Sequence, residues 1–182
     1  MPYIKISFDK IVFDPKVQTF CNNPKFKCPN YGHSHACPPV APYLEEKVST
    51  FKEFYLMYYK FNLDKYVKNK KKKSKRSKEK ILNSFYRKNI LRDHLEEEIN
   101  EFLSKFNNKF EEKLVLWDGF CRICYKEKKS CTYDSGDPCR YQPRYSMEAI
   151  GINVDQTVRN ANIEMEWPPI HYAYRFGLVC FK

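Results

Sequence analysis

The chain has 182 residues, a length typical of one domain with a sizeable core. Its hydrophobic content of 42%, with fourteen Phe and fourteen Tyr, excludes an intrinsically disordered chain. No run approaches the roughly 18 apolar residues of a membrane span. The N-terminal Met-Pro-Tyr-Ile-Lys-Ile lacks the apolar region and cleavage site of a secretory signal. We therefore expect a single domain, residues 1–182, that is cytoplasmic and has no membrane partner.

Alternation in residues 3–13 predicts a short edge strand. Residues 14–42 combine prolines and three cysteines without any period, which predicts a long irregular loop held by a metal. Residues 42–49 favour a short helix, because a proline and two glutamates stand early in it. The aromatic-rich residues 51–63 predict a central strand.

The formal net charge of +11 is concentrated in residues 65–80, which hold ten Lys or Arg and one Glu, whereas the other 166 residues carry only +2. We interpret this run as a basic insertion that forms a solvated loop or a helix extension. It contains only one aromatic residue and no base-reading motif. A weak RNA contact through residues 65–80, or electrostatic docking of an acidic electron-transfer partner, is the alternative.

From about residue 77 a helix is expected, with glutamates 96–98 mostly outside its apolar face. That face comprises Ile81, Leu82, Phe85, Leu91, Leu95, Ile99, Phe102, Leu103 and Phe106. The helix is expected to end at residues 107–108.

Residues 113–117 predict a second strand, and residues 171–181 predict a final strand after a proline stop at 167–169. Between them, residues 146–162 predict a helix in two pieces, broken at 151–153. This order predicts an α/β fold: a small mixed or parallel sheet with flanking helices and two cysteine-rich metal-binding loops. An α+β fold is the alternative.

Two groups of cysteines stand on the predicted loops. One is Cys121, Cys124, Cys131 and Cys139, four thiols within nineteen residues, and the other is Cys21, Cys28 and Cys37. In a reducing cytosol such thiols are metal ligands or free thiols rather than disulfides. We predict that the first four bind a cofactor and that all seven are metal ligands, because clustered thiolates suit soft metals.

Iron–sulfur ligation is favoured over zinc by the spacing. Structural zinc typically takes two close Cys pairs, whereas here only Cys121 and Cys124 form one. Irregular spacing with one tight pair suits a cuboidal [4Fe-4S] cluster, and the chain has room for one or two. Arg122, Arg140 and Arg144 are candidates to offset the negative charge of such a cluster.

Seven loop thiols are one fewer than two complete four-iron sites require. Three thiolates would leave one iron open to substrate, or Cys180 would complete the second site, or Cys21 would not be a ligand. A further option is that cysteines of both loops bind one and the same cluster. We expect Cys180 to be a buried thiol within a strand, and His33 and His35 to be ordinary loop residues. Glu148 is a helix-start carboxylate or an acid/base group.

Several blocks resemble a family of small prokaryotic proteins that is frequent in anaerobes and methanogenic archaea. They are the stretch from Cys28 to Pro42, Trp117-Asp-Gly-Phe-Cys-Arg-Ile-Cys, Pro138-Cys-Arg and the stretch from Arg144 to Val154. The resemblance implies a cysteine-bound metal, in particular iron–sulfur, with no known function. Two features depart from the family pattern: the six residues between Cys21 and Cys28, and the basic run.

Three functions follow as hypotheses. The first is an iron–sulfur protein of redox metabolism that exchanges electrons with a protein partner. The second is an enzyme whose [4Fe-4S] cluster has one open iron for a small or sulfur-containing substrate, and the third is a zinc-stabilised nucleic-acid-binding module. No catalytic residue is assigned. The sequence leaves open whether the chain forms a homo-oligomer.

Overall fold

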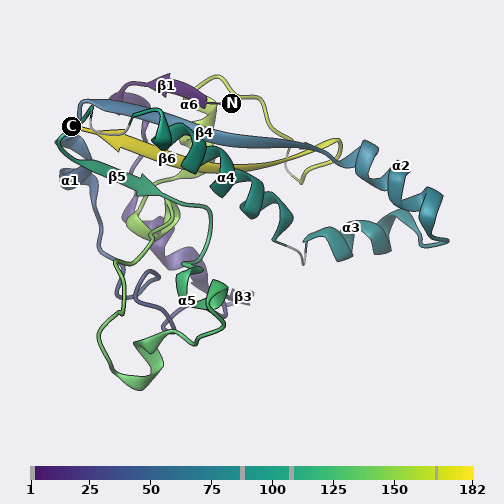
Figure 1. Ribbon diagram of the computed structural model, residues 1–182, viewed down its shortest axis with the longest axis horizontal. Coiled ribbons are helices and arrows are strands. Elements are labelled where there is room, and N and C mark those ends of the chain that lie inside the picture. Colours follow the sequence, from purple (N-terminus) through teal and green to yellow (C-terminus); the bar gives the residue numbers. More distant parts are fainter. Residues whose placement is uncertain (1–2, 87–88, 107–108, 167) are drawn as a thin grey trace.

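Figure 1 shows the computed structural model, which describes residues 3–86, 89–106, 109–166 and 168–182. A four-stranded sheet of order β1-β4-β6-β5 occupies the upper half of this view. Its strands are β1 Tyr3–Ile6, β4 Glu53–Asn62, β5 Lys113–Leu116 and β6 Tyr172–Phe181. The predicted mixture of helices and a sheet is confirmed. However, the strand pairs are all antiparallel, so the α+β alternative describes the fold better than a parallel or mixed sheet.

Both faces of the sheet are covered, which explains why residues 54–57 of the central strand β4 are all buried. Side chains alternate across a strand, so Leu56 and Tyr55 enter different apolar clusters. On one face the cluster includes Met147, Ile150, Ile152 and Val158. On the other face it includes Leu95, Ile99 and Phe102 of α4 Ile90–Ser104.

The helix predicted in two pieces is confirmed as η4 Glu148–Ile150 and α6 Val154–Asn160. Gly151 separates them with φ +97°, a conformation that favours glycine. A Cβ at this position would lie 2.4 Å from the ring of Tyr43. The break therefore lets the N-terminal segment pack directly against the turn between the two pieces.

The basic run is mostly helical, which agrees with the predicted helix extension, and residues 74–77 form a short connection. It lies in α2 Leu63–Lys73 and α3 Lys78–Tyr86, which extend beyond one end of the sheet (Figure 1). Leu63, Phe85, Leu91 and Ala173 form a buried cluster at the base of this arm. The lysines and the arginine of residues 65–80 are exposed. We call residues 63–86 the basic arm.

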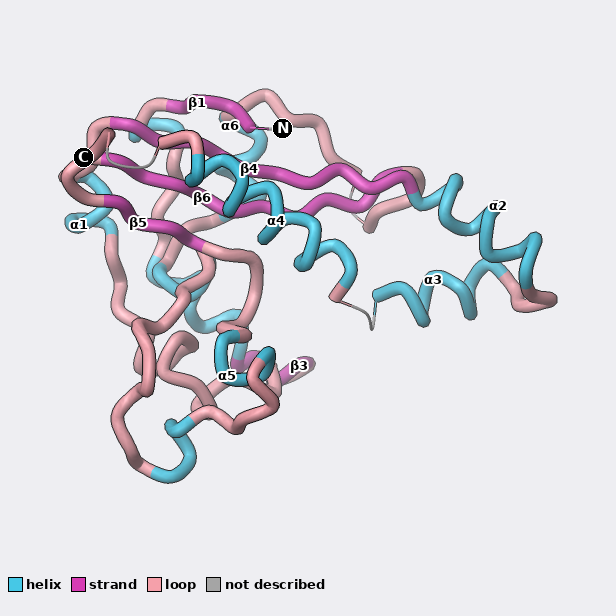
Figure 2. Tube along the Cα trace, in the orientation of Figure 1, coloured by secondary structure: helices cyan, strands magenta, loops and turns pink. Residues whose placement is uncertain are grey.

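Two segments distant in sequence, residues 14–44 and 117–146, lie side by side below the sheet (Figures 1 and 2). We call them together the thiol lobe, because they contain all seven loop cysteines. The predicted irregular loop contains short elements. In and beside the lobe are η1 Phe8–Lys10, η2 Pro15–Cys21, β2 Asn22–Asn23, β3 Phe26–Lys27, α1 Glu45–Ser49, α5 Ile123–Lys126 and η3 Thr132–Ser135.

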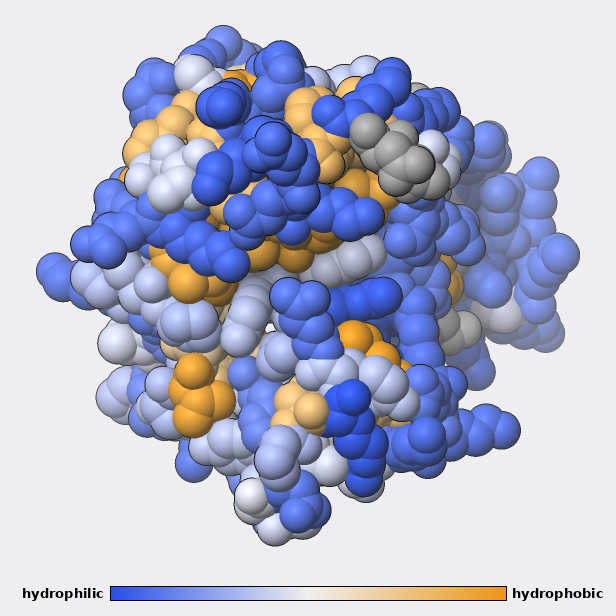
Figure 3. All heavy atoms as spheres, turned by 60° about the vertical axis from the view of Figure 1, so that its left-hand side comes forward, coloured by the Kyte–Doolittle hydropathy of each residue, from blue (hydrophilic) through white to orange (hydrophobic). Residues whose placement is uncertain are grey.

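The surface in Figure 3 is mainly hydrophilic, with apolar atoms in separate groups and a hollow between the two halves of the molecule. No helix in the described part of the chain has the length and apolar character that crossing a membrane requires. The helix end expected at 107–108 lies outside the described residues, as does Trp167, the first residue of the stop expected at 167–169.

Candidate metal centre

The four cysteines of residues 121–139 line one small, partly open cavity. Cys121, Cys124, Cys131 and Cys139 surround a space of about 20 Å³, which Ser34, His35 and Ala36 close from the N-terminal loop. All four thiols are half-buried. Within the described ranges, no three His, Cys, Asp or Glu side chains already meet as the ligands of a single metal ion do. The donor chemistry nevertheless fits a soft metal, because four thiols face one space.

Local hydrogen bonds explain how four thiols spread over nineteen residues come together. The carbonyl of Cys124 accepts from the backbone N–H of Glu127 at 3.1 Å and of Lys129 at 2.9 Å, which closes the turn at the end of α5. Farther on, the hydroxyl of Thr132 donates to the carbonyl of Pro138 at 2.9 Å. This second bond brings the two ends of the 131–139 segment back together, so that Cys131 and Cys139 reach the same cavity.

The N-terminal cysteine group, Cys21, Cys28 and Cys37, is organised by a short hairpin. β2 and β3 pair in antiparallel register, and the N–H of Cys28 donates to the carbonyl of Cys21 at 2.8 Å, which makes these two residues the next pair of the ladder. Burial raises the pKa of the Cys21 thiol, and the charges of Cys28 and Glu148 raise it further. The two thiols therefore lie close together, one directly before β2 and the other directly after β3.

Cys37 connects the two cysteine groups. It is buried, and this burial is the main reason why its pKa is raised to about 11. A hydrogen bond with Ser34 lowers the pKa in part, whereas Cys28, Cys21 and Cys121 raise it by their negative charge. Cys37 therefore lies within electrostatic reach of thiols of both groups.

Two histidines hold the two segments of the lobe together. His33 Nδ1 lies 2.9 Å from Oδ1 of Asp134, and His35 Nε2 lies 3.1 Å from the carbonyl oxygen of Asp137. A carbonyl can only accept, so Nε2 of His35 carries the hydrogen. We infer that both residues are the ordinary loop contacts expected from the sequence, since these ring nitrogens are occupied by protein groups.

The arginines expected to offset cluster charge are engaged elsewhere. The Arg122 guanidinium is buried and donates to Asp93 at 2.8 Å and to Glu96 at 2.6 Å, both on α4. Arg140 donates to the carbonyl of Ser130. The Arg144 guanidinium lies 4.3 Å from the centre of the Trp117 ring.

A second contact between α4 and the thiol lobe lies at Gly119. Arg92 donates to Asp118 at 2.8 Å and lies 5.0 Å from the ring centre of Phe120. Gly119 has φ +65°, and a Cβ there would be 2.5 Å from the Arg92 guanidinium. Together with Arg122, this contact fixes the start of the four-cysteine loop, residues 121–139, on α4. This attachment was not predicted from the sequence.

The eighth cysteine, Cys180, is fully buried in β6 within the main apolar cluster, and burial strongly raises the pKa of its thiol. This is the buried strand thiol expected from the sequence. Glu148 begins η4 and faces a pocket beside the lobe. Its side chain is exposed to the pocket, yet the surrounding protein raises its pKa by desolvation, and the charge of Asp118 adds to this effect.

Comparison with known proteins gives one match. No curated protein and no solved structure is detectably similar to the chain. The model of one family does match, and it covers residues 4–181, which include the sheet, the basic arm and all seven loop thiols. The chain therefore belongs to the family described as predicted metal-binding proteins (DUF2284).

Proposed function

We propose that this protein holds an iron–sulfur cluster on Cys121, Cys124, Cys131 and Cys139 and exchanges electrons with a protein partner. The convergence of these four thiols on one cavity supports the proposal. Four cysteine thiolates are the usual ligand set of a [4Fe-4S] cluster, which supplies one-electron chemistry when bound.

The other residues of the lobe position and shield the thiols. Ser34, His35 and Ala36 cover the cavity from the N-terminal loop, while Arg122 ties the loop to α4. The half-buried state of the four thiols keeps them close to the surface. Such a position suits electron exchange with a docked partner.

An enzyme is the second candidate, and the N-terminal cysteine group of Cys21, Cys28 and Cys37 favours it. Cys21 and Cys28 interact directly, and Cys37 lies within electrostatic reach of both. If these three thiols hold a second site, they leave one ligand position open, as catalytic metal sites do. A small substrate would then bind at that position.

A single zinc ion is the third candidate. The cavity of about 20 Å³ is close to the space of one small probe sphere, which favours one ion over a cluster. The exposed lysines of the basic arm would then supply the RNA contact of a zinc-stabilised module.

Metal analysis and visible absorption of protein purified without oxygen separate these candidates. The proposal expects iron, sulfide and a broad visible absorption, all lost in Cys121→Ser, Cys124→Ser, Cys131→Ser and Cys139→Ser. Cys180→Ala is the matched control, because that thiol lies in the core, and it should keep its iron. Zinc without iron would overturn the proposal. A partial loss of iron in Cys28→Ser would support the second site of the enzyme.

A further inference from the structure

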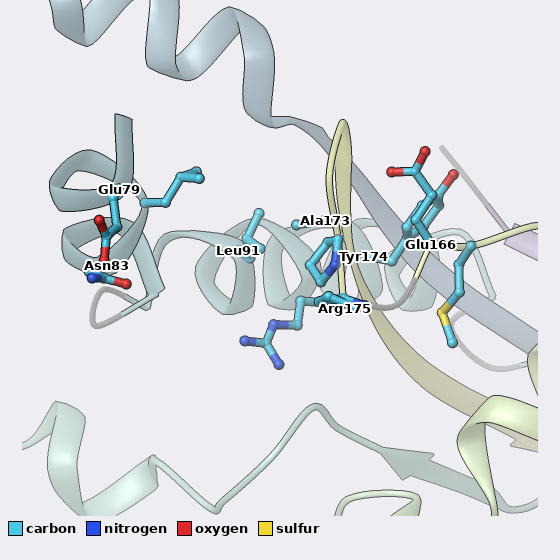
Figure 4. Close-up of a pocket in the computed structure, with 11 residues that line it drawn as sticks. Glu79, Asn83, Leu91, Glu166, Ala173, Tyr174 and Arg175 are labelled. Carbon is cyan, nitrogen blue, oxygen red and sulfur yellow. The ribbon is translucent and has the colours of Figure 1, made fainter. Parts of the chain in front are cut away.

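Two pockets adjoin at Arg175, next to the thiol lobe. One has a volume of about 380 Å³ and lies between α3, α4 and β6, and the other has a volume of about 500 Å³ and lies between α6, β6 and the turn at Asp118. Met165, Tyr174 and Arg175 line both of them. Figure 4 shows Arg175 extending from β6 into the first space, with Glu79 and Asn83 of α3 across from it. Both volumes lie in the range of about 300–1,000 Å³ that is typical of small-molecule sites.

The Arg175 guanidinium is poorly satisfied by the protein. Its Nε is buried without a hydrogen-bond partner among the described residues. Its ion pair with Asp118 is long, at 3.5 Å, and Arg92 already donates to the same carboxylate at 2.8 Å. Two guanidinium groups thus share one carboxylate. A half-enclosed cation in this state retains donors for an additional acceptor.

The other charged groups of the larger pocket are engaged with the protein. Asp155 accepts two hydrogen bonds from Arg159, at 2.9 and 3.2 Å. Glu148 interacts with Ser146. Three carboxyl groups and two arginines line this pocket, a formal charge of −1, so each additional negative charge on a ligand adds repulsion. A singly charged anion fits this balance better than a dianionic phosphate does.

The remaining wall is apolar and aromatic. Val154, Met165, Tyr174 and Phe176 face the larger pocket, on the side where Arg175 leaves β6. A ligand with one anionic group and an apolar body would therefore place its two parts against matching surfaces. Guanidinium is well suited to the anionic part, because its planar fork binds a carboxylate through two parallel hydrogen bonds.

We propose that this pocket binds a small organic carboxylate, with the carboxylate on Arg175 and the apolar body against Met165, Tyr174 and Phe176. The site lies beside the thiol lobe, since Asp118 is three residues from Cys121 and Glu148 is within electrostatic reach of Cys21. The proposal does not depend on which metal the thiols hold.

The test uses the full chain, purified without oxygen, and three probes: benzoate, hexanoate and the neutral isostere benzamide. In a two-dimensional NMR titration, benzoate and hexanoate should bind saturably and shift the Nε–H signal of Arg175 together with amides of residues 154–159 and 174–176. Benzamide should bind roughly ten- to a hundredfold more weakly, because it lacks the charge-assisted hydrogen bonds.

Arg175→Met should lower benzoate affinity to that of benzamide, whereas Lys113→Met, which removes an exposed cation of β5 outside this pocket, should leave it unchanged. Equal binding of benzoate and benzamide would overturn the proposal, as would shifts confined to another surface or no saturable binding by either acid. If Arg175→Met does not fold, the titration of the unaltered chain still decides the outcome.

Discussion

Arg122 and Glu96 form a buried ion pair between the four-cysteine loop and α4. The guanidinium donates to Oε1 of Glu96 at 2.6 Å, and only 4% of the arginine side chain and 13% of the glutamate side chain are exposed. Asp93, one turn earlier on α4, accepts a further hydrogen bond from the same guanidinium. The loop that carries the thiols is thus attached to a helix that itself packs on the sheet.

Arg122→Ala should therefore strongly destabilise the protein, because it leaves Glu96 enclosed without its buried partner. Because Lys126 still pairs with Glu96 after this change, we expect a loss of about 1.5–3 kcal/mol in the free energy of unfolding, measured by urea denaturation of the reduced chain. Arg159→Ala removes an exposed ion pair within α6 and should cost only about 0.3–0.5 kcal/mol. Equal effects of the two substitutions would show that the buried pair does not anchor the loop.

The same pair predicts a loss of stability in acid. Burial raises the pKa of Glu96, but hydrogen bonds from Lys126 and Arg122 outweigh it, so the pKa lies below its ordinary value of 4.5. Below pH 4.5 the unfolded state therefore binds more protons at this group than the folded state does, and stability rises with pH. The contribution is complete above that pH and is lost as the pH falls through the folded pKa.

Urea midpoints measured between about pH 3 and pH 6 check this expectation. The midpoint of the unaltered chain should fall more steeply in acid than that of Glu96→Gln, in which this carboxyl cannot titrate. Parallel profiles for the two chains would contradict the assigned role of Glu96.

His35 should control local opening of the thiol lobe. Its Nε2–H donates to the carbonyl of Asp137, so His35→Ala removes a bond between the two segments. We expect amide exchange in residues 131–139 to accelerate roughly fivefold, the effect of one hydrogen bond worth about 1 kcal/mol. His35→Gln, which can place a donor at a similar distance, should restore part of the protection. An unchanged rate of amide exchange in His35→Ala would show that this hydrogen bond does not limit opening of the thiol lobe.

Gly119→Ala should be more destabilising than Gly136→Ala. Both glycines have positive φ, +65° and +76°, so each substitution imposes backbone strain of about 1–2 kcal/mol. Only at Gly119 would the new Cβ meet the Arg92 guanidinium, which would have to leave Asp118. We expect an additional cost of about 1–3 kcal/mol at Gly119 from this lost charged contact, measured by thermal and urea unfolding. Similar costs at both positions would mean that Arg92 relocates freely.

Strand positions were predictable from the sequence, but strand direction was not. Aromatic richness located the strand that became Glu53–Asn62, and alternation located the strand that became Tyr172–Phe181, because both signals depend on the local sequence alone. Their antiparallel pairing joins residues more than 100 positions apart, such as Glu53 and Phe181. The chain between them is long enough for either direction, so the local pattern contains no information about it.

The candidate site shows the same limit. Cysteine spacing identified the four thiols that line one cavity, since nearby residues on one loop are already confined. Cysteine spacing did not reveal that Arg122 pairs with Asp93 and Glu96, because the partner of this arginine depends on how α4 packs beside the loop. Arg175 was also missed, since a single arginine in an apolar strand becomes notable only when the groups around it are known.

The order of the strands in the sheet has a consequence for how the protein is made. β6 is synthesised after the other strands, yet it lies between β4 and β5 and is the only one of the named strands that pairs with β5 in the described structure. The four-cysteine loop follows β5 directly. Until β6 has docked, β5 has no strand to pair with in the described sheet, although ion pairs with α4 already hold the start of the four-cysteine loop. Docking of β6 is therefore expected to be the step that fixes the β5 end of the four-cysteine loop.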